Sequence, residues 1–290
     1  MTHVLHQHPF TPYDQLPVVD VSSFRALPMA DSMLPAEMTN EFRHRVGTRP
    51  LDMAQWLPSD EETAPTIAMK GELLKTRRNE VVGLLEGGED AAGEAAQLVA
   101  DFAGKALQST GIDALVEAAL MVADDLVVMK SVVVAGVVCS PSRWRLSTKL
   151  GQDMLAVHRP VAKYADHVGG AVDTTMARLK ADQPMVRSNW TIEDHCSLFQ
   201  PVTPSAPLVS EPSQLWVRME RQTLRALPLC GGSMFTIRTY QQPITEYVAR
   251  GTDKARTLHS LIERLPDDVA KYKSLAHYRE SLLAWLEGYF

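Results

Sequence analysis

The longest apolar stretch of the chain runs from Leu126 to Cys139 and is rich in β-branched valine. A continuous run of this kind, without alternation, predicts a strand that is covered on both faces. The stretch includes Lys130 and is shorter than the roughly 20 residues that a membrane helix needs. We therefore expect a buried strand here and no membrane segment.

Two later segments, 215–227 and 233–244, alternate between apolar and polar residues with a period of two. Pro228 and the Cys-Gly-Gly triplet between them predict an antiparallel hairpin. Alternation divides the side chains of its first strand between two faces. One face carries Leu215, Val217, Met219, Arg221 and Thr223, and the other carries Trp216, Arg218, Glu220 and Gln222.

Several other segments have apolar residues at helical spacing. They are 66–85, 90–108, 112–123, 161–180, 245–264 and 267–287. Residues 1–65 are punctuated by proline and predict an irregular N-terminal arm. We expect a main domain over 66–250, with the C-terminal helices of 251–290 packed on it. Helical layers that flank a small antiparallel sheet make the fold α+β.

Composition excludes several classes of protein. Of the 290 residues, 45% are hydrophobic and 22% are charged, as in ordinary globular proteins. The net charge of −6 provides no basic surface for phosphates, so we expect no nucleic-acid partner. The three cysteines lack the spacing of a zinc site, a disulfide framework or a covalent haem. Because the N-terminus also lacks a signal-peptide pattern, we expect a cytoplasmic protein.

Standard catalytic motifs are absent from the sequence, including GxSxG, HExxH and the phosphate-binding glycine loops. Arginines concentrate instead between Cys139 and Tyr240. Arginines on both faces of a hairpin cannot all be solvated if one face packs on a core. Some of them must therefore meet buried carboxylates or a bound anion.

Seven short motifs occur in order between about residues 45 and 250. They are RPLDMAQWLPSD, ADDLVVMK, VVCSPSRWRLSTKLG, VHRPV, VRSNW, RMERQTLRALP and FTIRTYQQP. In this order they resemble the alpha subunit of haem-dependent oxidative N-demethylase and its relatives. The resemblance implies a PAS-like antiparallel sheet with a haem pocket and extra helices. It also implies an enzyme that oxidises a small secondary amine, such as dimethylamine, with dioxygen.

Within this resemblance, His158 of the VHRPV motif is the expected iron ligand of a non-covalent haem b. The plain alternative is a histidine that only bonds a backbone carbonyl at a chain reversal. The competing ligands are His167, His195, Cys139 and Cys230. The basic residues expected at the haem propionates are Arg143, Arg145, Lys149 and Arg187.

Glu220 lies in the middle of a predicted strand, where carboxylates are uncommon. It could be the anionic partner of a small ammonium substrate, a proton acceptor beside bound dioxygen, or half of a buried ion pair with Arg218 or Arg238. Arg221, Gln222, Arg238 and Tyr240 could polarise bound oxygen, hold propionates or only brace the sheet. We expect Glu220, Arg238 and Tyr240 to line a distal pocket.

The expected function is that of the catalytic subunit of a multisubunit haem monooxygenase in methylated-amine catabolism, which forms a primary amine and formaldehyde. Electrons must come from another protein, because the chain has no dinucleotide fingerprint and fewer than four cysteines. The resemblance places flavin mononucleotide (FMN), an iron–sulfur cluster and tetrahydrofolate in partner subunits. The alternatives are a haem-based PAS-like sensor or binding module without turnover, and a structural subunit that has lost haem.

Overall fold

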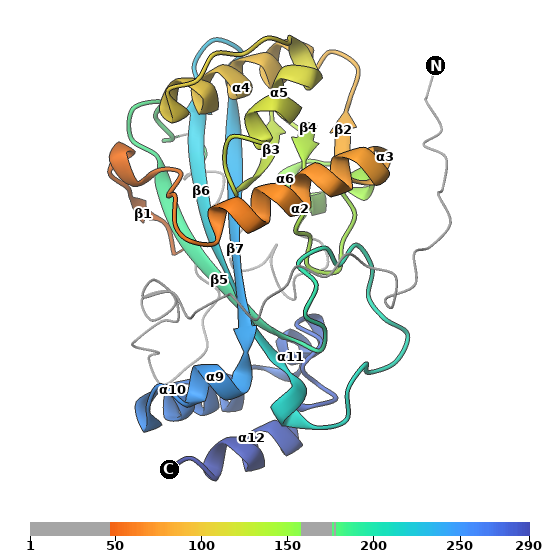
Figure 1. The fold of residues 1–290 in the computed structure, drawn as a ribbon, viewed down its shortest axis with the longest axis vertical. Helices are drawn as coiled ribbons and strands as arrows, with labels where there is room; N and C mark the ends of the chain where they lie inside the picture. The colour runs from red at the N-terminus through yellow and green to blue at the C-terminus, as the bar shows by residue number, and fades with distance from the viewer. Residues whose placement is uncertain (1–46, 158–175, 177) are drawn as a thin grey trace.

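The part of the chain that the structure describes is built on one antiparallel sheet of seven strands (Figure 1). The computed structural model describes residues 47–157, 176 and 178–290. The spatial order of the strands is β1-β5-β6-β7-β3-β4-β2. The strands are β1 (Arg49–Pro50), β2 (Val82–Leu84), β3 (Asp125–Met129), β4 (Val133–Val137), β5 (Met185–Glu193), β6 (Trp216–Leu227) and β7 (Gly232–Pro243). This arrangement, with helices on both sides, confirms the α+β, PAS-like fold class.

The hairpin β6–β7 forms the longest pair of strands, as the alternating pattern predicts. Its two 12-residue strands are in register from Trp216 opposite Pro243 to Leu227 opposite Gly232. The turn needs glycine, because Gly231 has a positive φ of 70°. A Cβ on Gly232 would lie 2.5 Å from the carbonyl oxygen of Met129 on the neighbouring strand. The hairpin tip therefore packs closely against β3.

The apolar run from Leu126 to Cys139 folds as the hairpin β3–β4 and not as the single strand that we expected. The polar pair Lys130 and Ser131 interrupts the run, and the amide of Lys130 bonds the carbonyl of Val132 to close the turn. Both strands are buried over their whole length, as the pattern predicts. Sequence periodicity does not show a tight turn when the residues on both sides of it are equally apolar.

The helices lie where the sequence predicts them, but most of them are shorter than predicted. The segment predicted as one helix over 66–85 divides into α2 (Thr63–Thr76), α3 (Arg78–Val81) and strand β2, which pairs with β4. The next two helices, α4 (Glu89–Ala103) and α5 (Gly111–Ala119), were predicted. The C-terminal helices are shorter than expected: α9 (Ile244–Val248), α10 (Thr252–Glu263), α11 (Asp267–Tyr272) and α12 (Arg279–Glu287). Breaks at Gly251, Pro266 and Ser274 divide them.

The remaining elements are short. Single turns of 3₁₀ helix occur at η3 (Met53–Gln55), η4 (Leu146–Thr148) and η5 (Pro212–Gln214), and α6 spans Met154–Val157. The end of the expected irregular arm is ordered, since β1 pairs with β5. Residues 1–46 and nearly all of the helix expected at 161–180 lie outside the described residues. None of the described helices has both the length and the apolar character needed to span a bilayer.

The sheet has two faces, which we define by the register of β5, β6 and β7. Face A carries the row Trp190, Met219 and Tyr240, and face B carries the next row, Asn189, Glu220 and Thr239. Residues opposite each other in an antiparallel pair lie on the same side, and neighbours along a strand lie on opposite sides. Every side chain of these strands can therefore be placed on one face.

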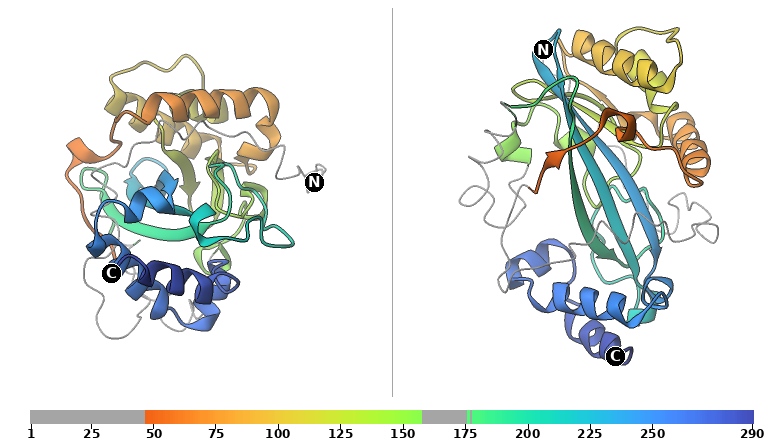
Figure 2. Two further views of the ribbon diagram at one scale, coloured as in Figure 1. Left: turned by 60° about the horizontal axis from the view of Figure 1, so that its bottom comes forward. Right: turned by 90° about the vertical axis from the view of Figure 1, so that its left-hand side faces the viewer.

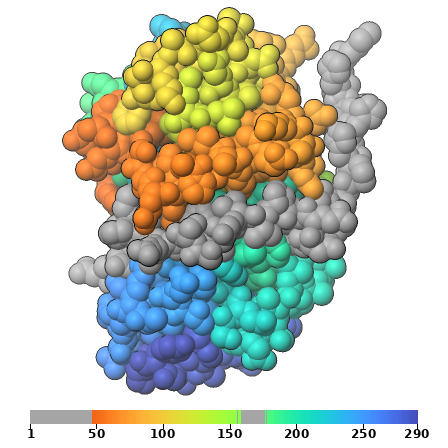
Figure 3. All heavy atoms as spheres, in the orientation of Figure 1, coloured from red at the N-terminus to blue at the C-terminus, as the bar shows by residue number. Residues whose placement is uncertain are grey.

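Face A is covered by helices at both of its ends (Figure 1). One apolar cluster joins Leu126, Val128 and Met234 to α2, α4 and α5. A second cluster joins Val217 and Met219 to the C-terminal helices. These two groups of helices form the upper and lower parts of the molecule in Figure 3.

Face B is covered by the segment that follows β4. Leu146, Trp144, Leu150 and Met154 pack there against Val127 and Phe235. Figure 2 shows α6 on the opposite side of the sheet from α2 and α4. The sheet thus separates the helical layers from the 144–157 segment.

Glu62, which directly precedes α2, is a buried carboxyl on the face A side and is only 4% exposed. Burial raises its pKa to about 8, and the nearby Asp60 and Glu61 add to this, while Arg238 opposes it. The unfolded chain releases this proton near pH 4.5. Stability is therefore unaffected by Glu62 below about pH 4.5 and falls as the pH rises toward 8.

The substitution Glu62→Gln should remove this loss of stability. We expect the free energy of unfolding of the variant, relative to the wild type, to increase from pH 5 to pH 8 and to level off above pH 8. Urea unfolding at pH 5, 6, 7 and 8 measures the difference. A difference that does not change with pH would show that Glu62 carries no buried proton.

Candidate functional site

Glu220 stands on face B with polar groups around its carboxylate. The amides of Asn189 and Gln222 both donate to its Oε2 atom, at 3.3 and 2.9 Å. The guanidinium Nε of Arg218 lies 3.7 Å from its Oε1 atom. Glu220 is 8% exposed, so these donors replace most of its hydration. Both amides donate to the same oxygen, while Oε1 faces the guanidinium of Arg218 at a distance too long for a hydrogen bond.

Arg218 is fully buried, and most of its donors serve other partners. Its Nη1 donates to the carbonyl of Leu198 at 3.2 Å, and its Nη2 donates to the carbonyl of Ser140 at 2.5 Å. The ion pair of Glu220 with Arg218, which the sequence left open, is thus present, but Arg218 also binds the two backbone carbonyls. The alternative pair with Arg238 does not form, because Arg238 binds Asp60.

The character of face B changes along β6 and β7. Phe235 belongs to the apolar cluster under Leu146, whereas Glu220 and Gln241 lie toward the polar end. Residues at alternate positions between them, such as Ile237, connect the two regions. This face combines an apolar wall with a polar edge, as a flat macrocycle with two carboxylates requires.

Lys149 fixes the chain at the end of α6. Its ammonium group donates to the carbonyl oxygen of Val157 at 2.7 Å, and burial lowers its pKa. Val157 and Met154 both pack against the apolar cluster of face B. The predicted ligand His158 comes next in the chain and lies outside the described residues, as does His167. Val157, the last described residue before His158, therefore lies on the face B side.

The competing ligands in the described residues have unsuitable surroundings. His195 accepts the amide of Ser197 on Nδ1 at 3.0 Å, so its neutral ring carries the proton on Nε2. An iron-bound histidine instead donates from one nitrogen and binds the metal with the other. Cys139 is fully buried, and burial raises the pKa of its thiol. Cys230 lies in the turn of the β6–β7 hairpin and packs against the apolar cluster of Leu126, Val128 and Met234 on face A.

The four basic residues predicted for propionates have different environments. Arg143 is held by two buried carboxylates of β5 and the following loop, with Nε 3.0 Å from Glu193 and Nη2 on Asp194. Lys149 holds Val157, as described above. Arg145 is half-buried beside the apolar cluster, and Arg187 lies on face B directly opposite Gln222.

Arg221, Arg238 and Tyr240 lie on face A, which is the opposite side of the sheet from Glu220. Arg221 donates to the carbonyls of Gln55 and Trp56, at 2.5 and 2.9 Å. Arg238 and Tyr240 both bind Asp60, at 2.7 and 3.2 Å.

The expected grouping of these residues is therefore revised. Of the five residues predicted from the hairpin, only Glu220 and Gln222 share face B, because alternate residues of a strand point to opposite faces. Arg221, Arg238 and Tyr240 connect the sheet to the segment before α2.

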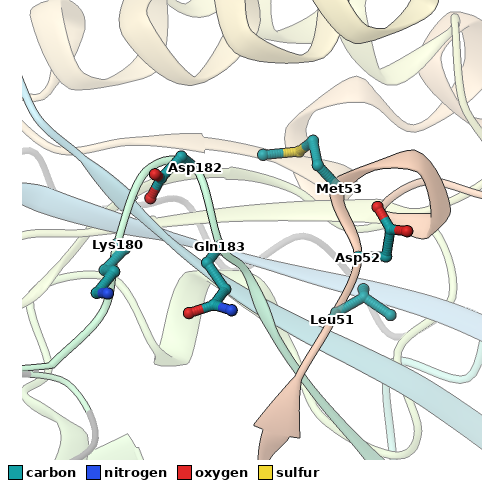
Figure 4. Close-up of a pocket in the computed structure, with 6 residues that line it drawn as sticks. All are labelled: Leu51, Asp52, Met53, Lys180, Asp182 and Gln183. Carbon is teal, nitrogen blue, oxygen red and sulfur yellow. The ribbon is translucent and has the colours of Figure 1, made fainter.

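An open pocket of about 470 Å³ lies at the edge of the sheet (Figure 4). It is lined by Leu51, Asp52, Met53, Lys180, Asp182 and Gln183. None of the predicted site residues lines it, and its walls come from the turns around β1 and before β5. It is separate from the polar part of face B.

Two neighbours of Glu220 have a role that the sequence did not suggest. Asn189, in the VRSNW motif, donates to the carboxylate of Glu220. Lys273, from the end of α11, binds Asn189 in turn at 3.3 Å. No motif marks Lys273, because 84 residues separate it from Asn189.

The ion pairs of Arg143 with Glu193 and Asp194 allow the contribution of buried charges to stability to be tested. Asp194 also accepts from the hydroxyl of Tyr278 at 2.9 Å and from the amide of Leu208. The substitution Asp194→Asn should reduce the free energy of unfolding by about 3 kcal/mol, because it leaves a buried guanidinium partly unpaired. The exposed pair of Asp267 with Arg279 is the control, and Asp267→Asn should change stability little. Urea unfolding measures both, and equal effects would contradict the assignment.

The sequence matches a known protein family. Residues 103–283 match the family described as haem-dependent oxidative N-demethylase, alpha subunit-like. The match extends from the end of α4 into α12, so it includes strands β3 to β7 and both faces at Glu220. It also spans well over half of the chain. The chain therefore belongs to the haem-dependent oxidative N-demethylase alpha subunit-like family.

Proposed function

We propose that the protein is the catalytic subunit of a haem-dependent monooxygenase that removes a methyl group from a small secondary amine such as dimethylamine. The observation that carries this proposal is the Glu220 carboxylate, held by two amide donors on a face whose other half is apolar. A methylated ammonium ion has the matching chemistry, with one charged centre and apolar methyl groups. The overall reaction takes dioxygen, two electrons and two protons, and yields a primary amine, formaldehyde and water.

The described residues of face B fit a haem. The cluster of Val127, Leu146 and Phe235 supplies an apolar wall, and the basic residues Arg187 and Arg145 lie on the same side of the sheet. We propose His158 as the iron ligand and these basic residues as partners of the propionates, with Lys149 holding the chain before His158. When bound, the haem would supply the activation of dioxygen. Arg143 is a weaker candidate for a propionate, since two carboxylates already match its charge.

The side chains of the protein would bind and orient the amine. Glu220 supplies the counter-charge, and Gln222 and Asn189 keep its Oε2 atom occupied, so that Oε1 remains for the substrate. The apolar wall would contact the methyl groups and exclude water, which strengthens the ionic interaction. In this proposal Glu220 binds the substrate and does not take a proton from it.

The electrons would come from a partner, since an alpha subunit by name belongs to a larger assembly. The three cysteines of the sequence are fewer than the four thiolates that an iron–sulfur cluster needs. We propose a flavin and iron–sulfur reductase as the electron donor, with FMN, the cluster and tetrahydrofolate in partner subunits. The three free thiols favour a reducing compartment, and we place the reaction in the cytoplasm.

The substitution His158→Ala tests the iron ligand. We expect the variant to lose haem, or to need added imidazole for a spectrum like that of the wild type. Absorption spectra after haem supplementation measure this. His195→Ala and His277→Ala are the controls and should retain the wild-type Soret band. Loss of haem from His195→Ala but not from His158→Ala would reverse the assignment.

The substitution Glu220→Gln tests the function. With an electron donor and dioxygen, we expect the wild type to release formaldehyde from dimethylamine, and the variant to keep its haem while KM rises about tenfold or more. Glu246 is exposed on α9, so Glu246→Gln should behave as the wild type. If the wild type binds haem but releases no formaldehyde from any methylated amine, the alternative function as a haem-based sensor or binding module is favoured. An unchanged KM in the variant would remove Glu220 from the substrate site.

A further inference from the structure

Lys273 is fixed in space by the way in which α11 ends. Ser274 adopts a left-handed conformation with a φ of 57°. The amide of Leu275 bonds the carbonyl of Ala270, and the amide of Ser274 bonds the carbonyl of Lys271. This is the Schellman pattern of a helix C-terminus, with Leu275 fully buried in the apolar cluster beside it. The backbone at Lys273 is thus held by the fold.

The side chain of Lys273 reaches from α11 to strand β5. Its ammonium group donates to the carbonyl oxygen of Trp190 and, at 3.3 Å, to Oδ1 of Asn189. It also lies 5.0 Å from the centre of the Trp190 ring. Burial lowers the pKa of Lys273 to about 8, and the carboxylates of Glu220 and Glu193 oppose this decrease. The ammonium is therefore still charged at pH 7.

The contacts with Lys273 and Glu220 together hold the amide of Asn189 in one orientation. An ammonium group can only donate, so the oxygen end of the amide must face Lys273. The nitrogen end then faces Glu220, where it donates to Oε2. Without Lys273 the oxygen end of the amide loses its donor, and the side chain of Asn189 is held only by its 3.3 Å bond to Glu220. The donor that stabilises Glu220 thus depends on a lysine that does not touch Glu220.

We propose that Lys273 is a positioning residue, which sets the affinity of the site for a small ammonium ion by orienting Asn189 toward Glu220. The inference rests on the proposed function of Glu220 as the counter-charge of the amine. It adds the C-terminal helices to the parts of the chain that determine this affinity.

The orientation of Asn189 can be measured without haem or amine. The side-chain amide of Asn189 gives a ¹⁵N–¹H signal pair that is assigned by its loss in Asn189→Leu. In the wild type and in Lys273→Arg, which keeps the donors, we expect these hydrogens to exchange slowly with solvent. In Lys273→Met we expect the chemical shift to change and the exchange to become faster. An unchanged Asn189 signal in Lys273→Met would overturn the proposal.

Binding of dimethylammonium to the haem-loaded protein at pH 7 measures the consequence. We expect Lys273→Met and Asn189→Leu each to raise Kd about tenfold, which is the effect of one charge-assisted hydrogen bond. The double variant should be no weaker than either single variant, because both changes remove the same contact. Lys273→Arg should bind close to the wild type, and so should Lys271→Met on the exposed side of the same helix.

The Glu220→Gln background separates positioning from a direct effect of charge. If Lys273 acts through Glu220, then Lys273→Met should not weaken binding further in that background. A direct repulsion between Lys273 and the bound cation would instead make binding tighter in both backgrounds, which would overturn the proposal. If Asn189 responds to Lys273→Met while Glu220→Gln leaves Kd unchanged, the positioning stands and the proposed function of Glu220 fails. Should Lys273→Met not fold, Lys273→Gln removes the charge with a side chain of similar length and is measured in its place, with the same expected changes in the Asn189 signal and in Kd.

Discussion

The register of β6 against β7 is the constraint on which the rest of the structure depends. The two strands pair without interruption over their whole length. Each residue of β6 therefore points to the same face of the sheet as the residue opposite it on β7. Glu220 faces Thr239, and Arg221 faces Arg238. A slip of one residue in a strand would turn its side chains to the opposite faces and would remove its apolar residues from the clusters that they now form. The apolar clusters at the two ends of face A and the one on face B together fix this register.

This constraint also determines what the charged residues can do. Arg221 and Arg238 bind carbonyl and carboxylate oxygens of the segment before α2. Arg218 binds loop carbonyls on face B, and Arg143 binds two carboxylates. Buried guanidinium groups of this kind are tolerated because each has acceptors within the fold. Glu220 differs, because its closest donors are neutral amides and its charge is only partly matched.

The C-terminal helices have a larger part in the site than their position in the chain suggests. They close one end of face A through an apolar cluster that includes Val217 and Met219. The same helices bring Lys273 to β5, where it contacts Asn189 and the backbone of Trp190. The packing of these helices and the polar surroundings of Glu220 are therefore linked through a single strand.

The sequence by itself determined the local elements and the family. Alternation at 215–227 and 233–244 predicted the β6–β7 hairpin, its turn and the two faces of its first strand, because a period of two follows directly from strand geometry. Ordered motifs identified the family, and an unusual carboxylate marked Glu220. The tertiary structure decided what periodicity cannot show: the turn within 126–139, the breaks in the C-terminal helices, and the assignment of Arg238 and Tyr240 to face A. It also decided the contact of Lys273 with Asn189, because contacts between distant segments depend on how the elements pack and leave no local pattern in the chain.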